Sequence, residues 1–225
     1  MIDIHIIPVF PMGIVALPGQ QIPLHIFEER YKLMIRDCLN VDAPFGIVLF
    51  SGDRMQDVGC TVRVIQIIHA YDDGRMDRLT QGEKRFVIQT LVEDKPYLQA
   101  SVTFFDDLPE TVDAGLRKTA QNGLALLREL ERHLSVRTKE DVLDVDDMKQ
   151  VSFALAGSEG FSAEEKQTFL EMTSTRARIE KSTRTMASTI ERVRLTEKIH
   201  AIIRGNGHLD ESLRSESLQD RATDL

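Results

Sequence analysis

The stretch PVFPMGIVALPGQQIPLHIFEERY, residues 8–31, decides the fold of this 225-residue chain. Pro18-Gly19 near its middle is a turn signal, because proline fixes φ and glycine accepts a positive φ. The apolar run 22–27 that follows predicts a strand. From residue 28 to residue 40, apolar side chains then recur every three or four positions, which is the spacing of one helix face. The stretch therefore predicts a turn, a strand and a helix in immediate succession.

Short strands surround this helix in the sequence. The first is expected to stop at Pro8 and Pro11, because proline lacks the N–H that a strand pairing needs. The other runs are rich in β-branched and aromatic residues and are bounded by turn residues. The predicted strands are 5–9, 22–27, 45–50, 60–67, 75–80, 85–92 and 98–105. Six or seven strands with one embedded helix favour a closed barrel or a sandwich, and the pattern alone leaves both open.

Two local signals refine the arrangement of these strands. In GCTVRVIQI, residues 59–67, the apolar phase slips by one position, which predicts a β-bulge near Val64 or Ile65. Asp73-Gly74 predicts a hairpin turn. Gly82, within GEKRF, marks a further tight point between two strands.

The second half of the chain has helical periodicity. Apolar residues recur on one face through 112–134, and shorter helices are expected at 146–156 and 162–172. Ser162 and Glu165 form a capping-box pattern at the start of the last of these. Thr173-Ser174-Thr175 is expected to break the helical pattern, and a long helix is expected to follow it to about residue 204. The sequence thus predicts a β-rich domain at 1–107, a helical subdomain at 108–204 and a disordered tail at 205–225.

Composition narrows the classes of function. The net charge is −8, and the β-rich part carries 15 acidic against 10 basic residues, which argues against nucleic-acid binding. No apolar run reaches the ~20 residues that cross a bilayer, and the N-terminus lacks a signal-peptide pattern, so we expect a cytoplasmic protein. Cys38 and Cys60 are not a C-x-x-C pair and are expected to be buried free thiols.

The chain lacks the common catalytic motifs. No glycine is followed directly by lysine, so the phosphate-binding G-x-x-x-x-G-K-[ST] is absent, as are H-E-x-x-H and G-x-S-x-G. The six histidines are scattered, and acidic pairs such as Asp146-Asp147 fit helix capping better than acid–base catalysis. We therefore expect a protein that is not an enzyme and that needs no metal or cofactor.

PLHIFEERY, GCTVRVIQI, DGR, GEKRF and the helical run FSAEEKQTFLE together resemble the N-terminal substrate-binding domain of the Lon protease family. The resemblance implies an α+β fold, in which a PUA-like β pseudo-barrel holds one embedded helix and is followed by a helical bundle ending in a long helix. A chain of 225 residues has no room for the ATPase and peptidase domains of Lon. We therefore expect a stand-alone, non-catalytic module of this kind.

Residues 27–31 and 82–86 are the candidate peptide-binding region. A functional interpretation takes them as a polar and aromatic patch, and a structural one takes them as core and hairpin residues, with Glu28 capping the helix or pairing with Arg85. The histidines His25 and His69 are expected to bond locally. The candidate binding residues are Leu24, Phe27, Glu28, Arg30, Tyr31, Arg85 and Phe86.

Three functions remain for such a module. The favoured one is binding of unfolded or flexible polypeptide, or of a protease complex that the protein serves as adaptor. The alternatives are RNA binding, because PUA-like barrels include RNA binders, and binding of a small molecule inside the barrel. The apolar stripe of the long helix is also compatible with a homodimer.

Overall fold

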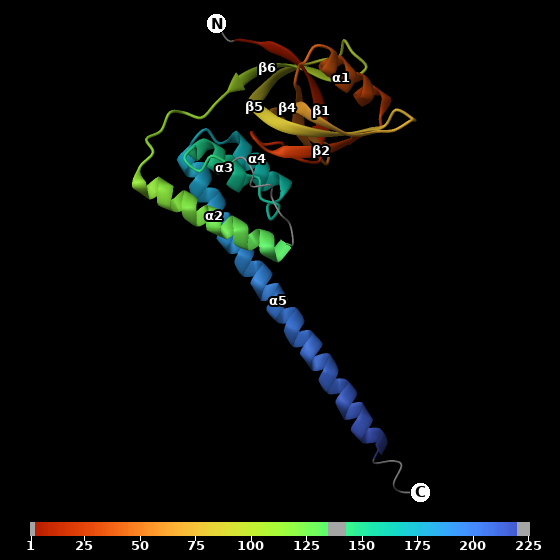
Figure 1. The fold of residues 1–225 in the computed structure, drawn as a ribbon, viewed down its shortest axis with the longest axis vertical. Coiled ribbons are helices and arrows are strands. Elements are labelled where there is room, and N and C mark those ends of the chain that lie inside the picture. Colours follow the sequence, from red (N-terminus) through yellow and green to blue (C-terminus); the bar gives the residue numbers. More distant parts are fainter. Residues whose placement is uncertain (1–2, 135–142, 220–225) are drawn as a thin grey trace.

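A computed structural model describes residues 3–134 and 143–219, with side chains placed for 3–134 and 143–203. A β-barrel forms the upper part of the molecule and four helices lie beneath it (Figure 1). In chain order the elements are β1 (His5–Met12), β2 (Gln21–Ile26), α1 (Glu29–Asn40), β3 (Phe45–Ser51), β4 (Arg54–Ala70), β5 (Met76–Val92), β6 (Gln99–Phe105), α2 (Ala114–Leu134), α3 (Met148–Ala156), α4 (Ala163–Glu171) and α5 (Thr175–Gln219). The expected α+β fold, with a barrel followed by helices, is confirmed.

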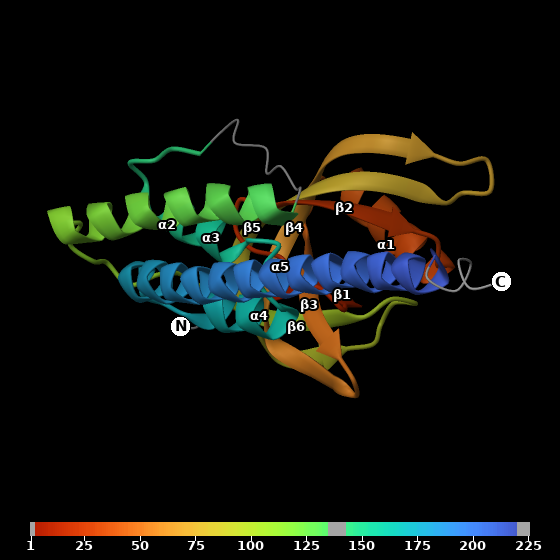
Figure 2. The same cartoon turned by 90° about the horizontal axis from the view of Figure 1, so that it is seen from below.

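The six strands form one sheet in the order β2-β5-β4-β3-β1-β6. A further pairing of β5 with β6 closes β5, β4, β3, β1 and β6 into a barrel, so the barrel is chosen over the sandwich. The long strands β4 and β5 continue past the closed part as a hairpin, and β2 pairs with the outer half of β5. The hairpin extends away from the rest of the barrel (Figure 2).

Strand β1 runs through both of its prolines, contrary to the prediction that they stop it. Residues 5–8 pair with β6 and residues 9–12 pair in parallel with β3, so each half of β1 takes its register from a different neighbour. Proline is tolerated where its missing N–H faces no partner. Likewise, β5 continues through Gly82, where we predicted a break.

The barrel interior has its own small core, separate from the larger core shared with the helices. Its centre is Phe86, which is fully buried. A Cβ atom at Gly46 or Gly59 would lie 2.6 or 2.5 Å from the Phe86 ring, so both positions need glycine to leave room for it. The other members of this core are Ile7, Val9, Val48, Ala100 and Val102.

Helix α1 packs its apolar face on the barrel. Tyr31 stacks on Phe10 with ring centroids 3.9 Å apart, and the Tyr97 hydroxyl donates to Asp37 at 2.8 Å. Cys38 and Cys60 are buried free thiols, as expected, and burial raises the pKa of Cys60 to about 12. The thiols therefore belong to the packed interior.

Helix α5 differs from the prediction at its C-terminal end. We expected it to end near residue 204 and residues 205–225 to be disordered, but it continues to Gln219, and residues 220–225 lie outside the described part. The extension contains no proline, and Gly205 and Gly207 each cost only about 1 kcal/mol in a helix. The helix projects far beyond the bundle (Figure 1). Within the described residues, no helix is long and apolar enough to cross a membrane.

Candidate functional site

The structure separates the predicted binding residues into two groups. Leu24, Tyr31, Arg85 and Phe86 are buried, with at most 7% of each residue exposed. Phe27 is exposed by 59%, and Arg30 beside it is also exposed. The structural interpretation therefore describes the first group, and only the residues around Phe27 are available to a ligand.

Glu28 does not form the pair with Arg85 that we considered. It occupies the N-cap position of α1 without a side-chain capping bond, and its carboxylate pairs with Arg30 at 2.8 Å. Arg85 lies elsewhere, on the strand that faces the helices. Its carboxylate partner is Asp107, in the segment that leaves the barrel.

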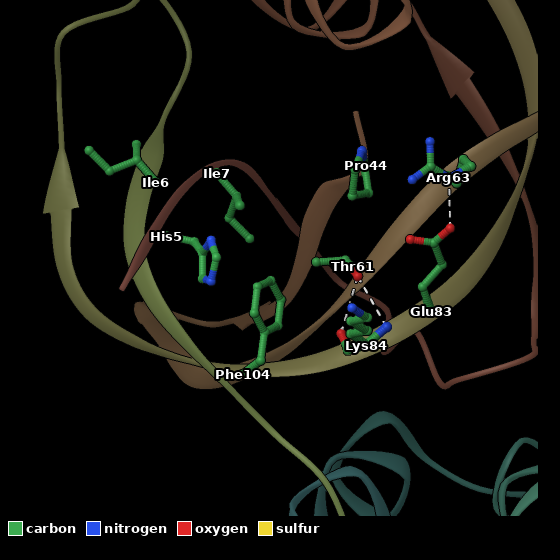
Figure 3. Close-up of a pocket in the computed structure, with 9 residues that line it drawn as sticks. All are labelled: His5, Ile6, Ile7, Pro44, Thr61, Arg63, Glu83, Lys84 and Phe104. Carbon is green, nitrogen blue, oxygen red and sulfur yellow. Dashed lines mark hydrogen bonds and ion pairs between the residues drawn. The ribbon is translucent and has the colours of Figure 1, made fainter. Parts of the chain in front are cut away.

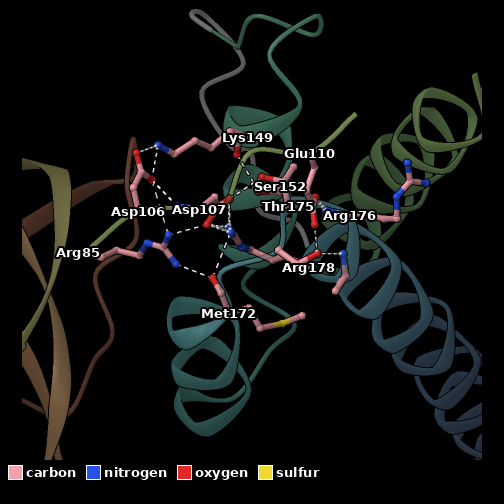
Figure 4. Close-up of polar contacts among 12 residues, drawn as sticks. Arg85, Asp106, Asp107, Glu110, Lys149, Ser152, Met172, Thr175, Arg176 and Arg178 are labelled. Carbon is pink, nitrogen blue, oxygen red and sulfur yellow. Dashed lines mark hydrogen bonds and ion pairs between the residues drawn. The ribbon is translucent and has the colours of Figure 1, made fainter. Parts of the chain in front are cut away.

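Arg85, Asp107 and Arg178 form a buried charged joint between barrel and helices (Figure 4). Arg85 donates to Asp107 at 2.5 Å and to the carbonyl oxygens of Leu170 and Met172 at 2.9 and 2.5 Å. Arg178 donates to both carboxylate oxygens of Asp107, at distances down to 2.5 Å. The joint therefore connects β5, the segment after β6, the end of α4 and the start of α5.

Burial and stacking fix this joint in place. The side chains of Arg85 and Arg178 are 1% and 0% exposed and that of Asp107 is 6% exposed. The Arg178 guanidinium lies 3.8 Å from the centroid of the Phe153 ring, and burial lowers its pKa. All these groups are engaged with one another, so the joint is an architectural feature and not a binding site. No local pattern predicts this joint, because Asp107 and Arg178 are 71 positions apart.

The outer half of β4 is an exposed apolar edge, which we call the free edge (Ile65–Ala70). Every residue in it is exposed, including Ile65 by 42%, Ile67 by 61% and Ile68 by 50%. Among the described residues β5 pairs with one side of this segment, and the pairing of β4 with β3 ends at Val62. Ile65 and Ile68 lie at register shifts, and the first of these is the predicted bulge.

An aromatic cluster (His25, Phe27, His69 and Tyr71) adjoins the free edge. His25 and the Tyr71 hydroxyl bond Asp77 at 2.6 and 2.9 Å, and these bonds lower the Asp77 pKa. Tyr71 contacts the His69 ring, with centroids 4.3 Å apart, and Phe27 stacks on His25 at 5.9 Å. His25 thus bonds a carboxylate on the neighbouring strand, as expected, whereas the His69 side chain makes a ring contact with Tyr71 and no hydrogen bond to any described residue. The two histidines also link Phe27, the exposed member of the predicted site, to the hairpin.

A pocket of about 370 Å³ opens at the mouth of the barrel (Figure 3). Ile7, Pro44 and Phe104 supply apolar walls, and charged residues lie at the rim. Sequence reasoning missed this pocket, because its lining residues come from five separate segments. In the part of the chain that the structure describes, no three His, Cys, Asp or Glu side chains are grouped to hold a metal ion. The available surfaces offer strand pairing, apolar contact and charge, which serve binding.

Comparison with known sequences identifies a matching family. The model of the ATP-dependent protease La (LON) substrate-binding domain matches residues 6–188. Lon protease of Anaeromyxobacter dehalogenans is 24% identical over 212 residues, which is 89% of this chain and 25% of that protein. Lon protease 2 of Myxococcus xanthus is also 24% identical, over 89% of this chain and 26% of that protein. The chain therefore spans about a quarter of the length of these relatives.

Comparison with solved structures gives the same fold. A Lon N-terminal domain protein from Xanthomonas campestris is 26% identical, with a TM-score of 0.61, and the match covers 79% of this chain and 96% of that one. The N-terminal domain of Mycobacterium avium complex Lon protease is 18% identical, with a TM-score of 0.62, over 81% of this chain and 98% of that one. The second likeness concerns the fold alone.

Proposed function

Because the chain belongs to the Lon substrate-binding domain family, whose model matches residues 6–188, we propose that it binds flexible polypeptide segments without altering them chemically. The observation that supports this function is the free edge of β4. An unpaired strand edge presents backbone N–H and C=O groups that an extended peptide can pair with, and side chains beside the edge select the sequence.

The free edge has register shifts at Ile65 and Ile68 but lacks the charged and proline residues that proteins use to protect such strands. No charged residue and no proline occurs from Val64 to Ala70, and three isoleucines are exposed there. Proteins blunt exposed edges with lysine, proline or a covering element, so an unprotected apolar edge indicates a surface that takes a partner strand. The rings of the aromatic cluster beside it offer apolar faces, and its histidine and tyrosine side chains also carry polar atoms. Such a surface can contact both the apolar and the polar side chains of an unfolded chain.

A binding experiment with a charged edge tests this function. Ile67→Lys introduces an ammonium group at an exposed position, so the fold is retained while an incoming apolar strand meets a charge. We expect the affinity for a fluorescently labelled, reduced and carboxymethylated protein to fall about tenfold, which corresponds to about 1.4 kcal/mol. Fluorescence anisotropy measures the change.

Leu91→Lys is the matched control, because Leu91 is also an exposed strand residue, 48% exposed, at the far end of β5. It should leave the affinity unchanged. Equal loss in both variants, or no binding by the unmodified chain, would refute the proposal.

Three finer properties are part of the same proposal. An adaptor role for a protease complex is supported by relatives that are Lon proteases, and a degradation assay with and without the chain addresses it.

A homodimer through α5 is supported by four exposed apolar residues on its projecting part, and sedimentation addresses it. These residues are Leu195, Ile199, Ile202 and Ile203. A cytoplasmic location suits binding of unfolded chains and is addressed by fractionation.

A further inference from the structure

The pocket at the barrel mouth is separate from the free edge and has its own chemistry. Ile7, Pro44 and Phe104 form its apolar part, and a second hollow of about 290 Å³ shares Glu83, Lys84 and Phe104 with it. Figure 3 shows His5, Ile7 and Phe104 pointing into the ring of strands. A volume of about 370 Å³ suits a small group and excludes a folded domain.

The rim carries charges of both signs, and most of these groups are already paired. Arg63 is already engaged, since it donates to Glu83 at 2.7 Å and to Asp42 at 2.9 Å. His5 lies 3.0 Å from Asp3. Lys84 differs from these groups, because no acidic side chain within the described residues pairs with it. Its ammonium group lies 5.8 Å from the centroid of the Phe104 ring, at the boundary between the polar rim and the apolar wall.

Thr61 holds Lys84 at this position. The Thr61 hydroxyl accepts from the Lys84 amide at 3.1 Å and donates to the Lys84 carbonyl oxygen at 3.3 Å. Thr61 is 1% exposed, and the β4–β5 register shifts beside it, between Cys60 and Val62. The hydroxyl therefore satisfies backbone groups that the irregular pairing leaves open, and this fixes the start of the lysine side chain at the pocket rim.

We propose that the barrel mouth binds the C-terminal residue of a polypeptide that ends in a large apolar side chain, with the terminal carboxylate at Lys84. An apolar wall beside one available ammonium group complements a ligand that carries a carboxylate and an apolar side chain on the same residue. Internal peptide residues lack the carboxylate, and Asp and Glu lack the apolar group. The inference rests on the proposed function for its ligand, a polypeptide, and adds a second contact remote from the free edge.

Two peptides that differ only at their C-terminus test this site. Both carry an N-terminal fluorophore and end in leucine, one as the free acid and the other as the carboxamide. The carboxamide lacks the negative charge that pairs with the exposed ammonium group of Lys84, so we expect the acid to bind about fivefold more tightly. Lys84→Met should remove this difference, and Lys84→Arg should retain most of it. Lys118→Met, at an exposed lysine of α2, is the matched control and should retain all of it.

The outcomes separate this site from the free edge. Equal affinity for acid and amide in the unmodified chain, or a difference that survives Lys84→Met, would overturn the proposal. N-acetyl-leucine is the competitor: if it binds as tightly as the peptide acid, the occupant is a free small carboxylic acid and the polypeptide assignment is wrong. Lys84→Met should leave binding of the carboxymethylated protein, whose internal segments occupy the edge, unchanged. If Ile67→Lys has no effect while acid and amide still differ, the free edge is not the polypeptide-binding surface and the barrel-mouth site stands.

Discussion

Asp107 is the one carboxylate between the two buried guanidinium groups of the joint, so its charge should matter more than that of its neighbour. Asp107→Asn leaves Arg178 buried without its carboxylate partner, and leaves Arg85 with only the exposed carboxylate of Asp106, 3.7 Å away. Removing one partner of a buried ion pair typically costs about 3–5 kcal/mol, so we expect the free energy of unfolding to fall by about that amount. Urea denaturation followed by circular dichroism measures it.

Asp106→Asn is the control for this substitution. Its side chain is 66% exposed, pairs with Lys149 and lies 3.7 Å from Arg85, and an exposed carboxylate contributes little, so the loss should stay within about 1 kcal/mol. Similar losses for the two variants would show that burial does not govern the joint.

At this scale the sequence predicted side-chain burial better than side-chain partners. The alternation of apolar residues accounts for the burial of Leu24, and helical spacing accounts for that of Tyr31. The partners of Arg85 were not predictable, because the groups that it bonds come from the segment after β6 and from the end of α4. Long-range proximity of this kind depends on how the elements pack and leaves no local pattern.

Gly82 joins the hairpin to the loop before β2, and this element-scale contact should fail with any larger residue. Its amide donates to the Gln20 carbonyl oxygen at 2.9 Å, and its own carbonyl accepts from Gly19 at 2.9 Å. A Cβ atom at Gly82 would overlap the backbone carbonyl of Leu17, which cannot move without breaking this contact. We expect Gly82→Ala to lower the free energy of unfolding by about 1–3 kcal/mol, measured by urea denaturation.

Gly13→Ala provides the comparison, because a Cβ atom there would meet no other atom within 4 Å. Its stability should be unchanged or slightly higher, since alanine restricts the unfolded chain. A loss at Gly13 equal to that at Gly82 would show that replacing a glycine is destabilising whether or not the new Cβ atom meets another residue, which would contradict the role of the contact with Leu17.

Local signals predicted individual elements well and pairings less well. The bulge near Val64, the turn at Asp73-Gly74 and the capping box of Ser162 with Glu165 are all present, because each depends on residues close in sequence. The continuation of β1 through its prolines was missed, since it depends on which neighbour pairs with each half. The free edge of β4 was missed for the same reason. A strand is recognised from its own residues, whereas an edge is defined by a missing neighbour.

At the scale of the whole molecule, the barrel and the helices should unfold together. The joint supports this expectation, as does Gln167 of α4, which donates to the Val58 carbonyl oxygen of β4 at 3.1 Å. Arg85 of the barrel needs the carbonyl oxygens at the end of α4 as hydrogen-bond acceptors. Arg178 of α5 needs the carboxylate of Asp107, in the segment after β6, as its counter-charge. The predicted division at residues 107 and 108 would then separate two structural parts of one cooperative unit.

The distribution of tyrosines allows a direct test of this coupling. The chain has three tyrosines and no tryptophan, and Tyr31, Tyr71 and Tyr97 all lie in the barrel part. Tyrosine signals therefore report the barrel, while circular dichroism at 222 nm reports mainly α2 to α5. In a two-state transition different probes give the same midpoint, so we expect the two urea curves to coincide. Fraying of the projecting end of α5 should add only a sloping baseline to the helical signal.

Two separate midpoints would show that the barrel and the helical part are independent domains, and Asp107→Asn should then destabilise each of them without changing the distance between the midpoints. If the curves coincide in the unmodified chain and separate in Asp107→Asn, the buried carboxylate is what makes the two parts one unit.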